Sequence, residues 1–144
     1  MTTRGSREDY KAFKIITTRW MDNDVYRHVN NVIYYSFFDT AVNQLLIEQG
    51  LLDYSRSPLI GLVVETQCRY HAPVAFPDII HAGVRVAKLG NSSVRYEIGL
   101  FRNDEPLAAA EGHFVHVYVD RDSNRPRSIP DAIRSFLSTL MLEP

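Results

Sequence analysis

Chemically reactive side chains are concentrated between residues 22 and 31, directly before a long apolar segment. The cluster contains two carboxylates, one imidazole and two carboxamides, from Asp22, Asp24, His28, Asn30 and Asn31. The apolar segment is predicted to be a helix, and the first N–H groups of a helix have no partner within it. Those groups carry partial positive charge. The arrangement is therefore suited to stabilising negative charge that develops on a substrate beside a carboxylate.

The segment from 31 to 49 has the periodicity of a helix, and Gly50 supplies a C-terminal stop. Its apolar stripe is formed by Tyr34, Phe38, Ala41 and Leu45. Further apolar residues flank this stripe, so we expect other parts of the chain to cover most of the helix surface. Tyr34 and Phe38 are predicted to belong to the core.

The remaining apolar segments have the alternation or length of strands, at residues 12–20, 62–70, 80–86, 94–100 and 107–119. Gly90-Asn91 predicts a primed hairpin turn between two of them. A short C-terminal helix is predicted from Asp131 to Leu142. Tight connections favour antiparallel neighbours, so we predict an α+β fold in which one antiparallel sheet is wrapped around the long helix. The small residues of 107–119 would let backbone or a partner approach closely. This long strand is also a candidate for pairing with a second copy, so we expect at least a dimer.

Composition restricts the class of protein. The 144 residues, 45% of them hydrophobic, fit a single domain spanning 1–144. A formal charge of −1 without a basic run disfavours nucleic acid as a partner. Cys68 is the only cysteine, which excludes an internal disulfide and a thiolate metal cluster within one chain. Neither a secretory nor a membrane-spanning segment is indicated, so we expect a cytoplasmic protein without a membrane partner.

Two motifs carry a family resemblance. The first covers the reactive cluster and the start of the helix, and consists of Asp22-x-Asp24, His28-Val29-Asn30-Asn31, Tyr34 and Phe37-Phe38-Asp39. The second consists of Tyr70-x-x-Pro73 and Pro77-Asp78. Together they resemble hotdog-fold acyl-CoA thioesterases of the 4-hydroxybenzoyl-CoA thioesterase type, over nearly the whole chain. The resemblance implies a hotdog fold, no cofactor, an acyl-CoA substrate and its hydrolysis to free acid and coenzyme A.

The resemblance also implies roles for the reactive cluster. Asp24 would be the catalytic carboxylate, either a nucleophile that forms a mixed anhydride or a general base on water. The backbone N–H of Asn31 would polarise the thioester carbonyl. In the family pattern His28 orients the loop rather than acting as an acid. The residues themselves indicate that Asp22 fixes the loop as an Asx-turn residue, with electrostatic support of the site as the alternative, and that Asn30 caps the helix, with direct substrate contact as the alternative.

Coenzyme A carries phosphate groups, which basic side chains and turn amides can bind. Related enzymes bind its nucleotide end where this chain has Lys88 and the turn Gly90, Asn91 and Ser92. Further cations are available at Arg121, Arg125 and Arg127, although a solvated loop is the preferred interpretation for these three.

Arg27 departs from the family pattern, because glycine commonly precedes the His-Val-Asn-Asn run. Arginine there either tolerates or changes the loop backbone, and its side chain is a candidate for an anionic part of the substrate. Glu65 is interpreted as a solvated strand residue. His113 and His116 are three apart on a strand and should point to opposite faces, so no metal site is expected.

A non-catalytic module that binds acyl-CoA is the alternative function, since it could share the whole fold. A hotdog dehydratase ranks third, and the absence of a Gly-x-Ser-x-Gly motif disfavours a serine hydrolase. The sequence leaves open whether the acyl group is aromatic, short or long. It also leaves open whether coenzyme A or a carrier protein bears the acyl group, and whether the assembly is a homodimer or a homotetramer.

Overall fold

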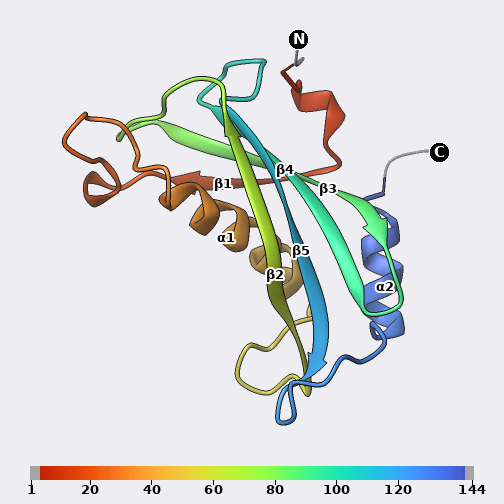
Figure 1. The fold of residues 1–144 in the computed structure, drawn as a ribbon. Coiled ribbons are helices and arrows are strands. Elements are labelled where there is room, and N and C mark those ends of the chain that lie inside the picture. The colour runs from red at the N-terminus through yellow and green to blue at the C-terminus, as the bar shows by residue number, and fades with distance from the viewer. Residues whose placement is uncertain (1–3, 142–144) are drawn as a thin grey trace.

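The computed structural model describes residues 4–141 as one antiparallel sheet with a long helix against one of its faces (Figure 1). The strands are β1 (Ala12–Thr17), β2 (Leu59–Tyr70), β3 (Ile79–Leu89), β4 (Ser93–Arg102) and β5 (Ala110–Asp120). The helices are α1 (Ile33–Glu48) and α2 (Asp131–Ser138), with short 3-10 helices at Arg7–Asp9 and Trp20–Asp22. The spatial order of the strands is β1-β3-β4-β5-β2, and every neighbouring pair is antiparallel. The predicted α+β hotdog fold is confirmed.

Helix α1 buries a single stripe against the sheet. The buried residues recur three and four positions apart, as expected for one helix face, at Tyr34, Phe37, Phe38, Ala41, Val42, Leu45 and Leu46. Ser36, Thr40 and Gln44 on the opposite face are exposed. The expectation that most of the helix is covered is therefore wrong for the single chain. Gly50 has φ 72°, the left-handed conformation typical of a residue that ends a helix.

The predicted 107–119 strand is not an edge of the sheet. It begins at Ala110 and lies between β4 and β2, so the edge strands are β1 and β2. The small residues have a cause within the chain, because a Cβ at Gly112 would collide with the Gln67 carbonyl and the Phe38 ring. Glycine thus lets α1 and β2 approach β5 closely. The first strand also ends earlier than predicted, at Thr17, before the 3-10 helix.

The chain reverses between β3 and β4 as predicted, and the turn closes with Gly90 N–H donating to Ser93 O at 2.8 Å. The turn is not primed, however, since neither Gly90 nor Asn91 has the positive φ that primed turns require. An irregularity in pairing between Val86 and Lys88 lies just before it. Such a bulge bends the strand and increases its local twist just before the turn.

Edge strand β2 has unusually high exposure for an apolar segment. Leu62, Val63 and Val64 are 40%, 49% and 61% exposed. The register of β2 with β5 shifts between Val63 and Glu65. Figure 1 shows β2 along one side of the sheet, with nothing paired to its outer edge. An apolar edge of this kind is a template for pairing with another chain.

The N-terminal segment covers part of the sheet face opposite α1. The Arg4 guanidinium donates to Ala108 O at 2.8 and 3.0 Å, and Arg7 donates to Glu105 O at 2.9 Å. Tyr10 is buried against Phe101 and Ala108. These contacts tie the start of the chain to the β4–β5 connection.

The histidines of β5 point to opposite faces, as predicted. His113 forms a 2.8 Å pair with Glu65 on the outer face, which agrees with the interpretation of Glu65 as a strand residue outside the site. His116 is buried beside the rings of Tyr96 and Phe114, and its Nε2 has no partner within the described residues. Burial lowers the pKa of His116 to about 4.

No helix within residues 4–141 is both long enough and apolar enough to cross a membrane. Within the same residues, no three His, Cys, Asp or Glu side chains come together as a metal site.

Candidate functional site

Asp24 lies in a tightly hydrogen-bonded loop before α1. Its N–H donates to His28 O at 2.9 Å, and Arg27 N–H donates to Asp24 O at 3.0 Å. One carboxylate oxygen of Asp24 accepts Tyr26 N–H at 2.8 Å. The other oxygen forms no hydrogen bond within residues 4–141. The loop therefore holds the carboxylate by one oxygen and leaves the second available.

Asp22 anchors this loop from inside the protein. Its side chain is 1% exposed, accepts the Arg19 N–H at 2.8 Å and pairs with the Arg19 guanidinium at 2.9 Å. Its backbone oxygen accepts Asn30 N–H at 2.9 Å. These contacts agree with the predicted supporting role. The His28 side chain is exposed, and the residue contributes to the loop through its backbone oxygen.

The start of α1 offers an unused hydrogen-bond donor. The prediction that Asn30 caps the helix is wrong, because α1 begins at Ile33 and its N-cap position is Val32. Asn30 Oδ1 instead accepts Val32 N–H at 3.1 Å and closes the turn that leads into the helix. The Asn31 N–H has no acceptor among the residues that the structure describes. Asn31 is fixed through its backbone oxygen, to which Tyr70 donates at 3.0 Å. A rigidly held N–H without an acceptor can bind an oxygen that becomes negative.

A cavity of about 440 Å³ contains Asp24 together with Trp20, Asn23, Arg27 and Phe76. The Trp20 and Phe76 rings meet edge to face with centroids 6.1 Å apart. Asn23 Oδ1 accepts Phe76 N–H at 3.0 Å, which joins the Asp24 loop to the segment before β3. Trp20, Asn23 and Phe76 are not among the site residues predicted from the sequence. Two of them are large aromatic residues in otherwise polar loops, which is the signal that could have identified them.

Arg27 adopts φ 66°, so the backbone keeps the left-handed conformation that glycine favours. Of the two outcomes considered for this position, the structure shows that arginine tolerates the conformation. Its side chain is exposed at the wall of the cavity.

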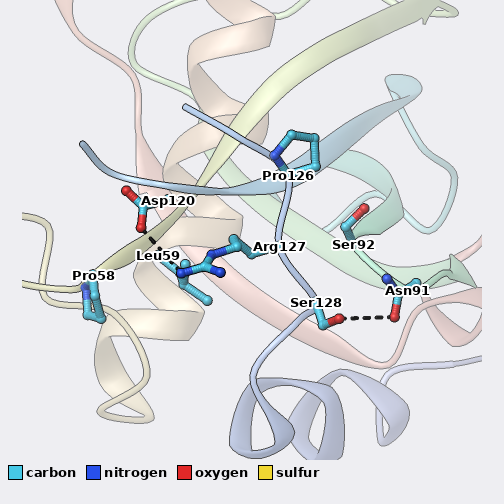
Figure 2. Close-up of a pocket in the computed structure, with 8 residues that line it drawn as sticks. All are labelled: Pro58, Leu59, Asn91, Ser92, Asp120, Pro126, Arg127 and Ser128. Atoms are coloured by element: carbon cyan, nitrogen blue, oxygen red, sulfur yellow. Dashed lines mark hydrogen bonds and ion pairs between the residues drawn. The ribbon is translucent and has the colours of Figure 1, made fainter. Parts of the chain in front are cut away.

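The predicted coenzyme A turn lies at a second cavity, of about 610 Å³ (Figure 2). The lining residues are Pro58, Leu59, Asn91, Ser92, Asp120, Pro126, Arg127 and Ser128. Figure 2 shows Arg127 directed toward Asp120, at 3.6 Å, and Ser128 toward Asn91, at 3.2 Å. Asn91 and Ser92 thus share a cavity with one of the candidate arginines, whereas Lys88 and Gly90 do not line it.

The turn at this cavity is held by its carbonyl groups. Arg134 donates to Gly90 O and Asn91 O at 2.9 and 3.0 Å, and Tyr118 N–H donates to Ser92 O at 2.7 Å. The N–H groups of Asn91 and Ser92 have no acceptor within residues 4–141. Arg121, by contrast, is structural, because it donates to Ser57 O and Tyr54 O.

The two cavities lie at opposite ends of β3. Hydrogen bonds from Thr18 to Asp78 and from Phe76 to Asn23 tie the Asp24 loop to the start of this strand. The Gly90 turn follows its other end. Eleven residues of strand span roughly 35 Å at about 3.3 Å per residue. Figure 1 shows the loop before α1 and the turn beside α2 far apart. A single chain therefore does not bring the predicted catalytic and coenzyme A residues together.

Comparison with known proteins identifies the family of this chain. A profile of the thioesterase-like superfamily matches residues 18–137. The PA5185 protein from Pseudomonas aeruginosa has a similar structure, with a TM-score of 0.94 and 56% identity over 96% of this chain and 97% of that one. No curated protein sequence matches.

Two thioesterases share the fold at lower identity. The DHNA-CoA thioesterase from Staphylococcus aureus has a TM-score of 0.76 and 16% identity, over 89% of this chain and 87% of that one. A gentisyl-coenzyme A thioesterase has a TM-score of 0.78 and 21% identity, over 88% and 99%.

Proposed function

Because the chain belongs to the thioesterase-like superfamily, and is therefore a thioester hydrolase, we propose that it hydrolyses acyl-CoA at the Asp24 cavity. One observation carries this proposal. A carboxylate with an unused oxygen and a backbone N–H with no acceptor occupy the same short loop-to-helix segment. These are the two groups that acyl transfer requires, one to attack the carbonyl and one to stabilise its oxygen.

The free oxygen of Asp24 has two possible roles in this reaction. As a nucleophile it attacks the thioester carbon and expels the coenzyme A thiolate, leaving a mixed anhydride that water then hydrolyses. As a general base it removes a proton from water, and the resulting hydroxide attacks the same carbon. In both routes the carbonyl oxygen becomes negative and Asn31 N–H donates to it. Water and thioester yield the free acid and the thiol.

After a single turnover in heavy-oxygen water, isotope found in Asp24 would establish the nucleophilic role. In the nucleophilic route, water can attack the aspartyl carbon of the anhydride and leave the heavy isotope in Asp24. The general-base route places the isotope only in the released acid. Mass spectrometry of the peptide that contains Asp24 detects the difference.

The nucleotide end of coenzyme A is assigned to the second cavity. Two free turn amides and the Arg127 guanidinium provide donors for phosphate oxygens there. Within one chain this cavity lies far from Asp24, so we propose a homodimer in which each substrate molecule contacts both copies.

The exposed edge of β2 is the surface that supports such a dimer. Antiparallel pairing of two β2 edges places the Leu59 end of one copy beside the Tyr70 end of the other. Leu59 lines the second cavity, while the Tyr70 hydroxyl contacts Asn31 O. The pairing would thus bring the coenzyme A cavity of one copy toward the catalytic end of its partner. A homotetramer built from such dimers is the alternative assembly.

Substitutions that introduce a charge on an edge strand test the proposed dimer. Val64→Lys on β2 should halve the molecular mass measured by light scattering and abolish turnover, because it places a charge in the middle of the apolar pairing edge. Ile15→Lys on β1, at a residue 67% exposed on the other edge strand, is the matched control and should leave the mass unchanged. An intact assembly of the Val64 variant would refute pairing through β2.

Substitution of the carboxylate tests the activity. Free-thiol release is measured for short, long and aromatic acyl-CoAs with the wild type, Asp24→Asn and Asp104→Asn. Removal of a positioned base or nucleophile should lower kcat/KM by ~10²-fold or more. Asp104 is exposed in the β4–β5 turn and serves as the control. Wild-type rates in Asp24→Asn would refute the assignment, and binding without turnover by the wild type would favour the non-catalytic module.

A further inference from the structure

Arg27 occupies a backbone position that disfavours its own side chain. The turn from Asp24 to Arg27 is closed by a 3.0 Å hydrogen bond and leaves Arg27 at φ 66°. Glycine would adopt this conformation without steric cost, whereas an L side chain adopts it with strain. Retaining arginine here therefore lowers the stability of the loop.

The fold gains no polar contact in return for this strain. The Arg27 side chain is exposed and forms no hydrogen bond or ion pair within residues 4–141, not even with Asp24 three residues before it. Every polar contact of the residue comes from its backbone. The guanidinium is thus available to a group outside the described chain.

The location of Arg27 limits what that group can be. Arg27 lines the same 440 Å³ cavity as Asp24, so it lies near the proposed catalytic carboxylate. The phosphates of coenzyme A are separated from the thioester by the long pantetheine arm, and their proposed donors lie at the other cavity. An anion beside Arg27 must then belong to the acyl group.

We propose that Arg27 selects acyl-CoAs whose acyl group carries its own carboxylate, a specificity that rests on the proposed function of the Asp24 cavity. Asp24 alone would repel such a group by like charge. A guanidinium on the same wall offsets this repulsion and can hold a carboxylate by two parallel hydrogen bonds. The aromatic rings of Trp20 and Phe76 form the apolar remainder of the cavity.

Binding measurements test the proposal separately from turnover. Glutaryl-CoA and pentanoyl-CoA have acyl chains of equal length that differ in the terminal carboxylate. Their affinities are measured by calorimetry on the Asp24→Asn protein, with and without Arg27→Gln, beside coenzyme A alone. Loss of a charged hydrogen-bond partner should weaken glutaryl-CoA about 10- to 100-fold and leave pentanoyl-CoA and coenzyme A within about twofold.

Controls separate this role from others. Arg125→Gln, on an exposed loop at the other end of the molecule, should change none of the three affinities. Equal weakening of all three ligands, no weakening of glutaryl-CoA, or a change in assembly mass on Arg27→Gln would each overturn the proposal. Failure of the wild type to hydrolyse any acyl-CoA would refute the proposed function, while the binding preference would still decide the role of Arg27.

Discussion

The two ends of the sheet are built differently. At the Asp24 end, the reactive groups are only partly engaged, since one carboxylate oxygen, the Asn31 N–H and the Arg27 guanidinium lack partners within the described residues. At the Gly90 end, every carbonyl of the turn accepts a hydrogen bond, and the amides of Asn91 and Ser92 have no acceptor within residues 4–141.

This difference corresponds to two functions, stabilisation of a transition state and binding of a phosphate group. Groups that act on a transition state must be held but not satisfied, because their partner exists only during the reaction. A cradle for a phosphate needs rigid walls and a few donors, and the charge it binds is the same before and after the reaction. Changes to the Asp24 carboxylate and the Asn31 N–H should therefore affect kcat. Changes at the second end should affect KM, as should loss of the Arg27 guanidinium, whose proposed partner is already present in the bound substrate.

The largest effect is expected at the Asn31 N–H. Asn31→Pro removes this donor together with the side-chain carboxamide. Proline fits here because Asn31 follows the first residue of the turn closed by Ile33 N–H to Asn30 O, a position that favours proline. We expect kcat to fall by about 10²- to 10³-fold with the fold retained. Asn31→Ala keeps the N–H and should be nearly neutral. Steady-state kinetics and circular dichroism of both variants check this, and equal activity of the two would exclude the amide as a donor.

The buried core between the two ends should lose stability as the pH falls. His116 has a pKa of about 4 when folded and 6.5 when unfolded, so the unfolded state binds the proton first as pH falls. The stabilisation from neutral His116 is fully present above pH ~6.5 and is lost as the pH falls toward ~4. Over this range the free energy of unfolding should fall by up to about 1.4 kcal/mol per pH unit. Urea titrations at several pH values measure this slope. His116→Phe should flatten it, and an unchanged slope would assign the acid sensitivity elsewhere.

The smallest effect is expected at the coenzyme A cavity. Arg127 has a side chain 60% exposed and a 3.6 Å contact with Asp120, so its removal should disturb the fold little. Arg127→Ala should raise KM about tenfold through loss of a phosphate contact and leave kcat unchanged. Arg125→Ala is the neighbouring control. A fall in kcat for Arg127→Ala would contradict the division between the two ends.

Local features of this chain were predictable because local chemistry determines them. Gly50 ends α1 within one residue of the expected position, and His113 and His116 point to opposite faces because strands alternate. The anchoring role of Asp22 also followed from its place in a tight loop. In these cases a few neighbouring residues are sufficient to fix the geometry.

The wrong predictions concerned contacts between distant segments. The 107–119 strand was a candidate for pairing with a second copy, yet β5 lies between β4 and β2, and Gly112 accommodates Phe38 and Gln67 of the same chain. The walls of the Asp24 cavity were missed because Trp20 and Phe76 are 56 positions apart and meet only through the fold. The order of strands, which composition does not encode, decides both.

The N-terminal segment has a practical consequence for handling this domain. The family profile begins at residue 18, after β1 and after the arginines that reach the β4–β5 connection. A shortened version cut at that boundary would expose the hydrogen-bonding edge of β3 and uncover Phe101, inviting aggregation. Recombinant fragments should therefore keep the residues from Arg4 onward, even though the family match ignores them.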